Sequence, residues 1–208
     1  MRICEIFKSI QGEGLTMGLP TVFVRTVGCN LRCSWCDTMY SMDGGQEMSV
    51  SEIVSKVGPC RTVCVTGGEP MIQSEMIDLL NALLKADKRI VLETNGSVDL
   101  KDVPKDPRIM ISMDIKCPSS GMSGHMLDSN TALLTGKDQL KFIIKDQTDF
   151  DYAVRYLQEH RVDTNVIFGP VGGTDKLEWL VDSVLESGVE ARVLPQLHKI
   201  IWGDKRGV

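Results

Sequence analysis

The sequence lacks an apolar run long enough to cross a membrane. No stretch of its 208 residues approaches the roughly 20 apolar residues that a transmembrane helix needs. Residues 1–10 also lack the long apolar core and the small-residue cleavage site that are typical of a signal peptide. From these absences we expect a cytoplasmic protein without a membrane partner.

The sequence also lacks an excess of positive charge. It has 23 basic and 28 acidic residues, which give a formal net charge of −5. A protein whose main partner is nucleic acid usually carries a basic surface, so we expect no nucleic-acid partner. Low-complexity linkers and internal repeats are absent as well. We therefore predict a single domain over residues 1–208, with a hydrophobic share of 42% that supports a sizeable core.

Three of the seven cysteines are clustered. Cys29, Cys33 and Cys36 lie within the stretch GCNLRCSWCDT, in a Cys-x3-Cys-x2-Cys spacing. So short a loop cannot easily join these thiols in disulfides, but it can wrap them around one metal centre. Soft thiolate ligands select zinc, copper(I) or iron–sulfur clusters. The cysteines therefore indicate a reducing compartment and a metal rather than a disulfide framework.

A fourth cysteine is missing from this loop. Structural zinc sites use four protein ligands, and ordinary electron-transfer clusters use four cysteines. A cubane cluster held by three cysteines would leave one iron open for a substrate. The alternative is a zinc knuckle with a distant fourth ligand, for which Cys60, Cys117 and His198 are candidates.

The hydrophobic pattern alternates between short strands and helices. Strands are predicted over residues 21–27, 62–66, 89–93, 109–115, 140–144, 165–168 and 191–194, and helices over 49–57, 71–85, 150–157 and 177–185. Such repetition is typical of βα units on a parallel sheet, whose strands end at one common edge. The fold class predicted is α/β, a partial, open (βα) barrel of about six parallel strands with its site in the loops that follow the strands.

Three further features carry chemistry. The stretch Gly67-Gly68-Glu69-Pro70 follows a strand, where glycine backbone can approach a ligand and a carboxylate can accept from an ammonium group. It could equally be a plain turn that starts a helix at Pro70. Gln11-Gly12-Glu13-Gly14 is either a ligand-binding loop or an ordinary turn. Arg25 interrupts a predicted strand and either faces solvent or meets an anion in a site.

The cysteine loop and the GGE stretch together resemble the signature of the radical SAM enzymes. Trp35 adds to this, because that family usually has an aromatic residue just before its last cysteine. Within the superfamily the whole chain resembles the 7-carboxy-7-deazaguanine synthase family. The matching stretches are SIQGEG (9–14), FVR (23–25), GCNLRCSWCDT (28–38), TGGEP (66–70), ETNGS (93–97), SMDIKCPSSG (112–121) and QLHKIIWG (196–203).

This resemblance implies an abbreviated radical SAM core with a [4Fe-4S] cluster, S-adenosyl-L-methionine and Mg²⁺ as cofactors. In that family the cluster reduces S-adenosylmethionine to a 5′-deoxyadenosyl radical. The reaction implied converts 6-carboxy-5,6,7,8-tetrahydropterin to 7-carboxy-7-deazaguanine with loss of ammonia, for queuosine or archaeosine-type deazapurines. A homodimer and an external electron donor of flavodoxin or ferredoxin type are implied as well.

The resemblance also assigns roles to individual residues. The cluster ligands are Cys29, Cys33 and Cys36, and the Mg²⁺ ligand is Thr38. The substrate-binding residues are Ile10, Gln11, Gly12, Glu13, Arg25, Thr66 and His198. The residues that bind S-adenosylmethionine are Trp35, Asp37, Gly67, Gly68, Glu69, Ser112, Met113, Asp114, Gly169, Pro170, Val171 and Gly172. No side chain is expected to be the catalytic group, because the radical is generated on S-adenosylmethionine.

Two points stay open at this level. His198 is either a substrate contact or a structural histidine, and in some family members the C-terminal carboxylate contacts the substrate, whereas this chain continues past Trp202 as GDKRGV. Two other functions also remain. One is a glycyl-radical-enzyme activase, which would leave Arg25 and the QGEG stretch unexplained, and the other is a non-enzymatic zinc-binding module.

Overall fold

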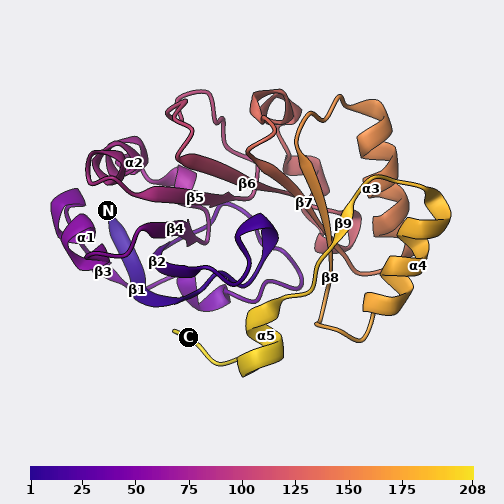
Figure 1. Cartoon of the computed structure of the whole chain (residues 1–208), viewed down its shortest axis with the longest axis horizontal. Coiled ribbons are helices and arrows are strands. Elements are labelled where there is room, and N and C mark those ends of the chain that lie inside the picture. The colour runs from indigo at the N-terminus through magenta and orange to yellow at the C-terminus, as the bar shows by residue number, and fades with distance from the viewer.

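A single nine-stranded sheet forms the centre of the protein. The computed structural model describes residues 1–208, and the strand order is β3-β1-β2-β4-β5-β6-β7-β8-β9. The strands are β1 (Arg2–Ile10), β2 (Pro20–Thr26), β3 (Gln46–Glu47), β4 (Thr62–Gly67), β5 (Arg89–Thr94), β6 (Ile109–Ile115), β7 (Gln139–Ile144), β8 (Asn165–Pro170) and β9 (Arg192–Val193). The edge strands β3 and β9 do not pair with each other, so the sheet stays open (Figure 1).

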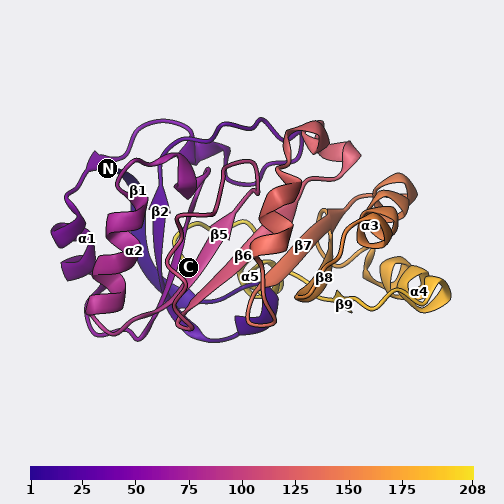
Figure 2. The same cartoon turned by 90° about the horizontal axis from the view of Figure 1, so that it is seen from above.

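Five α-helices accompany the sheet. They are α1 (Val50–Val57), α2 (Met76–Lys85), α3 (Gln147–Glu159), α4 (Leu177–Ser187) and α5 (Leu197–Trp202). Short 3-10 turns are η1 (Gly14–Thr16), η2 (Met39–Ser41), η3 (Pro70–Ile72), η4 (Pro118–Ser120), η5 (Ser123–His125) and η6 (Asp128–Leu133). Figures 1 and 2 show α1 and α2 beside one half of the sheet, α3 and α4 beside the other, and α5 apart from them. None of these helices has the length and apolarity that crossing a membrane would require.

The strand directions confirm the predicted parallel sheet. Strands β2, β4, β5, β6, β7, β8 and β9 run parallel in unbroken succession. The first strand, β1, pairs antiparallel with β2, and β3 pairs antiparallel with β1. This antiparallel edge was not predicted from the sequence. It extends the open half-barrel beyond the strand that leads into the cysteine loop.

Alternation along the strands gives the sheet two chemically different faces. The outer face is apolar and packs against the helices, with Val24, Val65, Leu92, Met113 and Phe142 fully buried. Side chains at adjacent positions of a strand point to opposite faces. The sequence neighbours of these core residues therefore lie on the opposite, inner face of the sheet, and they are Arg25, Thr66, Glu93, Asp114 and Lys141.

Local capping sets the helix boundaries. Helix α1 starts as predicted, because Ser49 and Glu52 form a reciprocal capping box. The prediction that a helix begins at Met71 was wrong, since α2 begins only at Met76. The Glu69 carboxylate accepts from the Met71 amide and closes η3 instead. A proline turn thus separates β4 from its helix.

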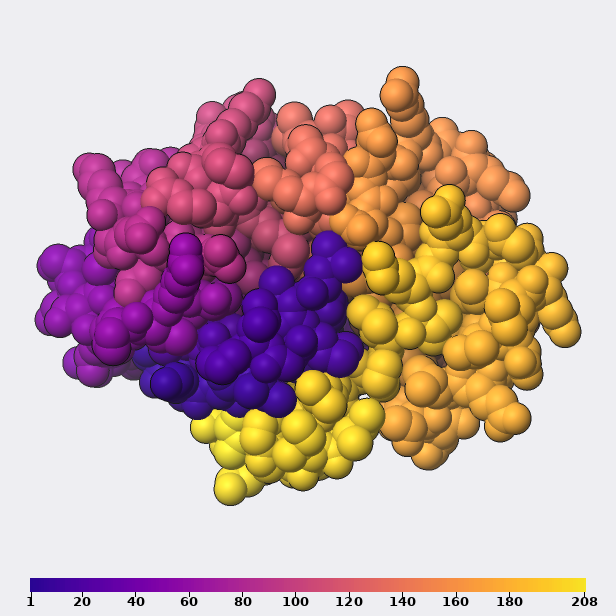
Figure 3. All heavy atoms as spheres, in the orientation of Figure 1, coloured from indigo at the N-terminus to yellow at the C-terminus, as the bar shows by residue number.

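The C-terminal segment lies against the N-terminal hairpin. The Leu197 amide donates to the Gly12 carbonyl at 2.9 Å, and the space-filling view shows the last residues beside the first ones (Figure 3). A Cβ atom at Gly12 would lie 2.1 Å from His198 Nδ1, so only glycine permits this approach. Helix α5 was not predicted from the sequence.

The buried face of α2 supplies a test of the core. Leu83 is fully buried, whereas Leu185 on α4 is 74% exposed. Leu83→Ala should lower the free energy of unfolding by about 2–5 kcal/mol because it leaves a cavity. The matched Leu185→Ala should change it by less than about 0.5 kcal/mol. Urea denaturation of both variants measures the difference, and equal midpoints would contradict this packing.

Candidate active site

A cavity of about 530 Å³ opens over the inner face of the sheet, at the C-terminal ends of the parallel strands. This volume is sufficient for a small-molecule ligand. Most of the residues predicted from the sequence line it together. They are Ile10, Gln11, Gly12, Glu13, Arg25, Cys29, Cys33, Trp35, Cys36, Asp37, Thr38, Thr66, Gly67, Gly68, Asp114, Pro170, Val171, Gly172 and His198.

Four predicted residues are not part of the lining. Met113 points to the outer face and is fully buried in the core. Ser112 is on the inner face but lies beneath Gln139, whose side-chain amide donates to its hydroxyl at 2.6 Å. Gly169 lies in β8 and directly precedes the lining residues Pro170, Val171 and Gly172. Glu69 is fully buried, and its carboxylate is directed to the end of β5.

The three clustered cysteines are free thiols, each half-buried. Cys29 Sγ accepts from the Leu31 amide at 3.4 Å and from Asn95 Nδ2 at 3.7 Å. Cys36 Sγ lies 3.6 Å from the Thr38 hydroxyl. Burial raises the pKa of Cys33, and the neighbouring Cys36 and Cys29 add to this while Lys116 opposes it. The thiols are thus close enough to influence each other, and N–H donors are present for Cys29 as a thiolate.

This donor set fits an iron–sulfur cluster. Three soft sulfur ligands face one cavity, and Gly67 and Gly68 line the same cavity beside them. No group of three or more His, Cys, Asp or Glu side chains is arranged to hold a single metal ion. Cluster ligands bind different irons and need not converge on one point.

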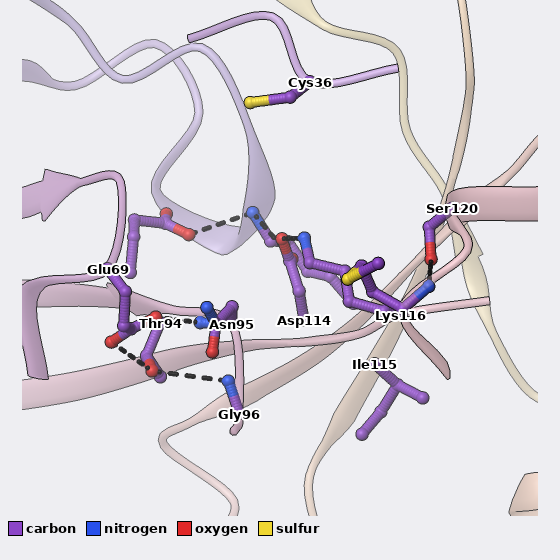
Figure 4. Close-up of polar contacts among 12 residues, drawn as sticks. Cys36, Glu69, Thr94, Asn95, Gly96, Asp114, Ile115, Lys116 and Ser120 are labelled. Atoms are coloured by element: carbon purple, nitrogen blue, oxygen red, sulfur yellow. Dashed lines mark hydrogen bonds and ion pairs between the residues drawn. The ribbon is translucent and has the colours of Figure 1, made fainter. Parts of the chain in front are cut away.

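Close backbone packing fixes the cysteine loop to β4. A Cβ atom at Gly68 would lie 2.1 Å from the Gly28 carbonyl oxygen, and the Glu69 amide donates to that same oxygen at 2.8 Å. The Glu69 carboxylate accepts from the Thr94 hydroxyl at 2.9 Å and from the Asn95 amide at 2.6 Å (Figure 4). Burial raises the pKa of Glu69 to about 7, although these hydrogen bonds oppose the shift. The GGE stretch thus joins the cysteine loop to the end of β5.

Arg25 lies on the wall of the cavity, and its side chain is 14% exposed. Its Nε donates to Glu5 at 2.8 Å, and its guanidinium lies 6.0 Å from the ring centroid of Phe7 and 5.8 Å from that of Tyr40. Tyr40 in turn donates to Glu5 at 3.1 Å. Burial opposes the charge of Arg25, but the hydrogen bond to Glu5 raises its pKa above the ordinary value. The interpretation that this arginine faces the site, not solvent, agrees with this position.

The C-terminal tail forms another part of the wall. Residues 203–208 all line the cavity, and the Arg206 guanidinium lies 3.8 Å from the Tyr40 ring centroid. Such a distance is a close cation–π contact. His198 lines the cavity as well and packs against Gly12. Both ends of the chain therefore contribute to one site.

Several residues that line the cavity were not predicted from the sequence. Glu93, Lys116 and Lys141 line the cavity as an ionic group, and Phe7 and Phe23 stack on one another with centroids 5.0 Å apart. The sequence contains an indication of Lys141 as a site residue. This lysine interrupts the apolar strand QLKFII, just as Arg25 interrupts its own strand. The aromatic pair carries no comparable signal, since such residues also build cores.

Comparison with known proteins agrees with this geometry. A model of the radical SAM superfamily matches residues 23–184. The 7-carboxy-7-deazaguanine synthase of Thermoplasma acidophilum is 41% identical over 210 residues, covering 100% of both chains. The enzyme of the same name from Methanospirillum hungatei is 43% identical, covering 97% of this chain and 85% of its own. The chain belongs to the 7-carboxy-7-deazaguanine synthase family of radical SAM enzymes.

Solved structures show the same fold. The crystal structure of QueE from Escherichia coli is 22% identical and matches with a TM-score of 0.73 over 92% of each chain. Streptococcus suis SuiB, bound to its precursor peptide, matches with a TM-score of 0.63 at 14% identity, over 82% of this chain and 47% of its own. Membership of the superfamily implies a [4Fe-4S] cluster and S-adenosylmethionine as cofactors. Cys29, Cys33 and Cys36 are the residues that would hold the cluster.

The cysteine loop generates a direct prediction. Cys29→Ala, Cys33→Ala and Cys36→Ala should each abolish cluster retention, because each removes one of only three protein bonds to the cluster. Cys60→Ala is the control, since Cys60 is half-buried and lies outside the cavity lining. Iron and sulfide assays with anaerobic absorption spectra measure retention. A full complement of iron in Cys33→Ala would contradict the assignment.

Proposed function

We propose that this protein converts 6-carboxy-5,6,7,8-tetrahydropterin to 7-carboxy-7-deazaguanine by a radical ring contraction that releases ammonia. The observation that carries the proposal is that one cavity is lined both by the residues expected to bind the cofactors and by those expected to bind the substrate. The cysteine loop, Gly68 and Arg25 line it at the C-terminal ends of β2 and β4, and the QGEG loop, which follows β1, lines it at the opposite end of β2. Sequence identity of 41% and 43%, extending over 97–100% of this chain, to proteins named 7-carboxy-7-deazaguanine synthase supports the same reaction.

The cavity residues would divide between cofactor and substrate. The cluster and S-adenosylmethionine, when bound, supply the radical that starts the reaction. Trp35, Asp37, Gly68 and Asp114 line the part of the cavity where S-adenosylmethionine would bind. The residues proposed for the pterin are Ile10, Gln11, Gly12, Glu13, Arg25, Thr66 and His198. Glu69 would act indirectly, because its carboxylate is buried between β4 and β5.

Arg25 is the proposed partner of the substrate carboxylate. Only its Nε is engaged by Glu5, and its two terminal nitrogens have no hydrogen-bond partner in the protein. These two nitrogens form one edge of the guanidinium fork and match a carboxylate in a bidentate pair. Glu5 orients the guanidinium from behind and leaves that edge available.

Further parts of the proposal concern metal, partners and location. Thr38 is the proposed protein ligand of Mg²⁺, since its hydroxyl lies on the cysteine loop and lines the cavity. Mg²⁺ usually keeps water and substrate oxygens as its other ligands, so a single hydroxyl suffices. We further propose a cytoplasmic homodimer that receives electrons from a flavodoxin or a ferredoxin.

The function is tested by anaerobic assay of the reconstituted protein with the pterin, S-adenosylmethionine, Mg²⁺ and dithionite. We expect 7-carboxy-7-deazaguanine and ammonia in equal amounts, identified by mass spectrometry. The glycyl-radical-enzyme activase alternative predicts S-adenosylmethionine cleavage without conversion of the pterin. Absence of the deazaguanine product from a fully loaded enzyme would refute the proposed reaction.

Arg25→Ala should raise the apparent substrate constant at least about tenfold, the equivalent of 1.4 kcal/mol. The physical reason is the loss of a bidentate pair in a partly desolvated site. Arg25→Lys should recover only part of the loss, because an ammonium group cannot copy the fork. Arg192→Ala on β9 is the control, since Arg192 is exposed and outside the cavity. Substrate titrations decide, and equal constants for Arg25→Ala and wild type would exclude Arg25 as the carboxylate partner.

Thr38→Ala should weaken the Mg²⁺ dependence and slow turnover while leaving the cluster in place. The hydroxyl is the proposed metal ligand, whereas the thiols around it are unchanged. Thr38→Ser retains a hydroxyl at the same position and should preserve the Mg²⁺ response. Turnover measured against Mg²⁺ concentration compares the three proteins. An unaltered response in Thr38→Ala would mean that the metal ligand lies elsewhere.

A further inference from the structure

A buried lysine lies at the centre of the inner face. Lys141 belongs to β7, its side chain is 7% exposed, and its Cα is the direct register partner of Asp114 on β6. A buried ammonium is costly unless it is paired and hydrogen-bonded, so its partners explain its presence.

Three carboxylates surround this ammonium. Lys141 Nζ lies 2.9 Å from Glu93 Oε2, 3.1 Å from Glu13 Oε2 and 3.4 Å from Asp114 Oδ1. A lysine ammonium has three N–H donors. Two of them donate to Glu93 and Glu13, whereas Asp114 Oδ1 lies within ion-pair distance but has no hydrogen-bond partner. Lys141 therefore acts on the site chiefly through the two glutamate carboxylates that it binds.

Each carboxylate has a second partner on its other oxygen. Gln11 donates to Glu93 Oε1 at 3.4 Å, and Gln196 donates to Glu13 Oε1 at 2.6 Å. Lys116 donates to Asp114 Oδ2 at 2.8 Å, a contact drawn in Figure 4. The network thus connects the QGEG loop, strands β5, β6 and β7, and the segment before α5. A carboxylate has about four lone-pair sites, so the partly exposed Glu13 and Glu93 keep acceptors for a ligand in the cavity.

The charges in this group do not cancel. Three carboxylates share two ammonium groups, those of Lys116 and Lys141. Burial alone would lower the pKa of Lys141, but the three carboxylates raise it well above its ordinary value. Burial would likewise raise the pKa of Glu13, yet Lys141 and Gln196 lower it. Without Lys141, like charges would face each other across a buried space and turn apart.

We propose that Lys141 is a positioning residue, which holds the carboxylates of Glu13 and Glu93 toward the cavity so that they accept hydrogen bonds from the N–H groups of the substrate heterocycle. This inference rests on the proposed function and deepens it. The excess of acceptors suits a ligand with several N–H donors on one edge, as the pyrimidine ring of a pterin has.

The experiment compares Lys141→Met with Lys141→Arg in the reconstituted holoenzyme. Lys137→Met is the matched control, because Lys137 pairs with Asp138 and lies outside the cavity lining. We expect Lys141→Met to weaken pterin binding at least tenfold by anaerobic calorimetry, and Lys141→Arg to restore part of it. We also expect less deazaguanine product per 5′-deoxyadenosine released. Mere destabilisation would lower both compounds together and leave their ratio unchanged.

A crystal structure of Lys141→Met separates this inference from the proposed reaction. We expect the Glu13 and Glu93 carboxylates to leave their present positions, whether or not a pterin is the substrate. Unchanged carboxylates in that structure, or a product ratio and pterin affinity equal to those of Lys137→Met, would overturn the positioning role. If Lys141→Met does not fold, Lys141→Gln undergoes the same measurements. A wild-type protein that neither binds nor converts the pterin would refute the proposed function, while the carboxylate positions would still decide the role of Lys141.

Discussion

Burial of charge on the inner face of the sheet is the constraint on which the site depends. Because strand residues alternate between faces, placing Leu92 and Met113 in the core directs Glu93 and Asp114 inward. A buried carboxylate needs hydrogen-bond donors or a nearby cation to offset its lost hydration. Lys141 meets this requirement through the parallel register that pairs it with Asp114. The register of the sheet therefore also fixes the charges in the site. A register shift of one residue would turn the core side chains of a strand toward the cavity and its charged side chains toward the core.

The cysteine loop is held by contacts with the ends of two strands, and the missing side chain of Gly68 makes the closest of these contacts possible. The absence of a side chain at Gly68 lets the Gly28 carbonyl approach, and Glu69 then connects this junction to the end of β5. Asn95, which follows that strand, reaches back to Cys29 Sγ. The thiols are thus held by two neighbouring strands of the sheet. Such preorganisation suits a cluster whose open iron must meet a ligand in a fixed orientation.

Local sequence patterns predicted the parallel strands and α1, because hydrophobic period and capping are local properties. The family resemblance, rather than these local patterns, assigned Arg25, the QGEG loop and the cysteines to one site. The predicted start of α2 was wrong because the side chain of Glu69 caps a turn at Pro70 instead of a helix. The ion pair between Lys141 and Glu13 joins residues 128 positions apart, and no local pattern indicates such a partner. A motif does not say which face each of its residues occupies, and the side chain of Met113 lies in the core.

The C-terminal segment both lines the cavity and contacts the residues that supply its acceptors. Gln196 donates to Glu13, the Leu197 amide donates to the Gly12 carbonyl, and Arg206 lies over Tyr40. All three contacts involve elements that also line the cavity. A ligand that binds only when this segment is docked stabilises the docked state by mass action. Release of the segment would remove a hydrogen bond from Glu13 and leave Lys141 as its remaining partner. The segment that lines one wall of the cavity therefore also orients one of its acceptors.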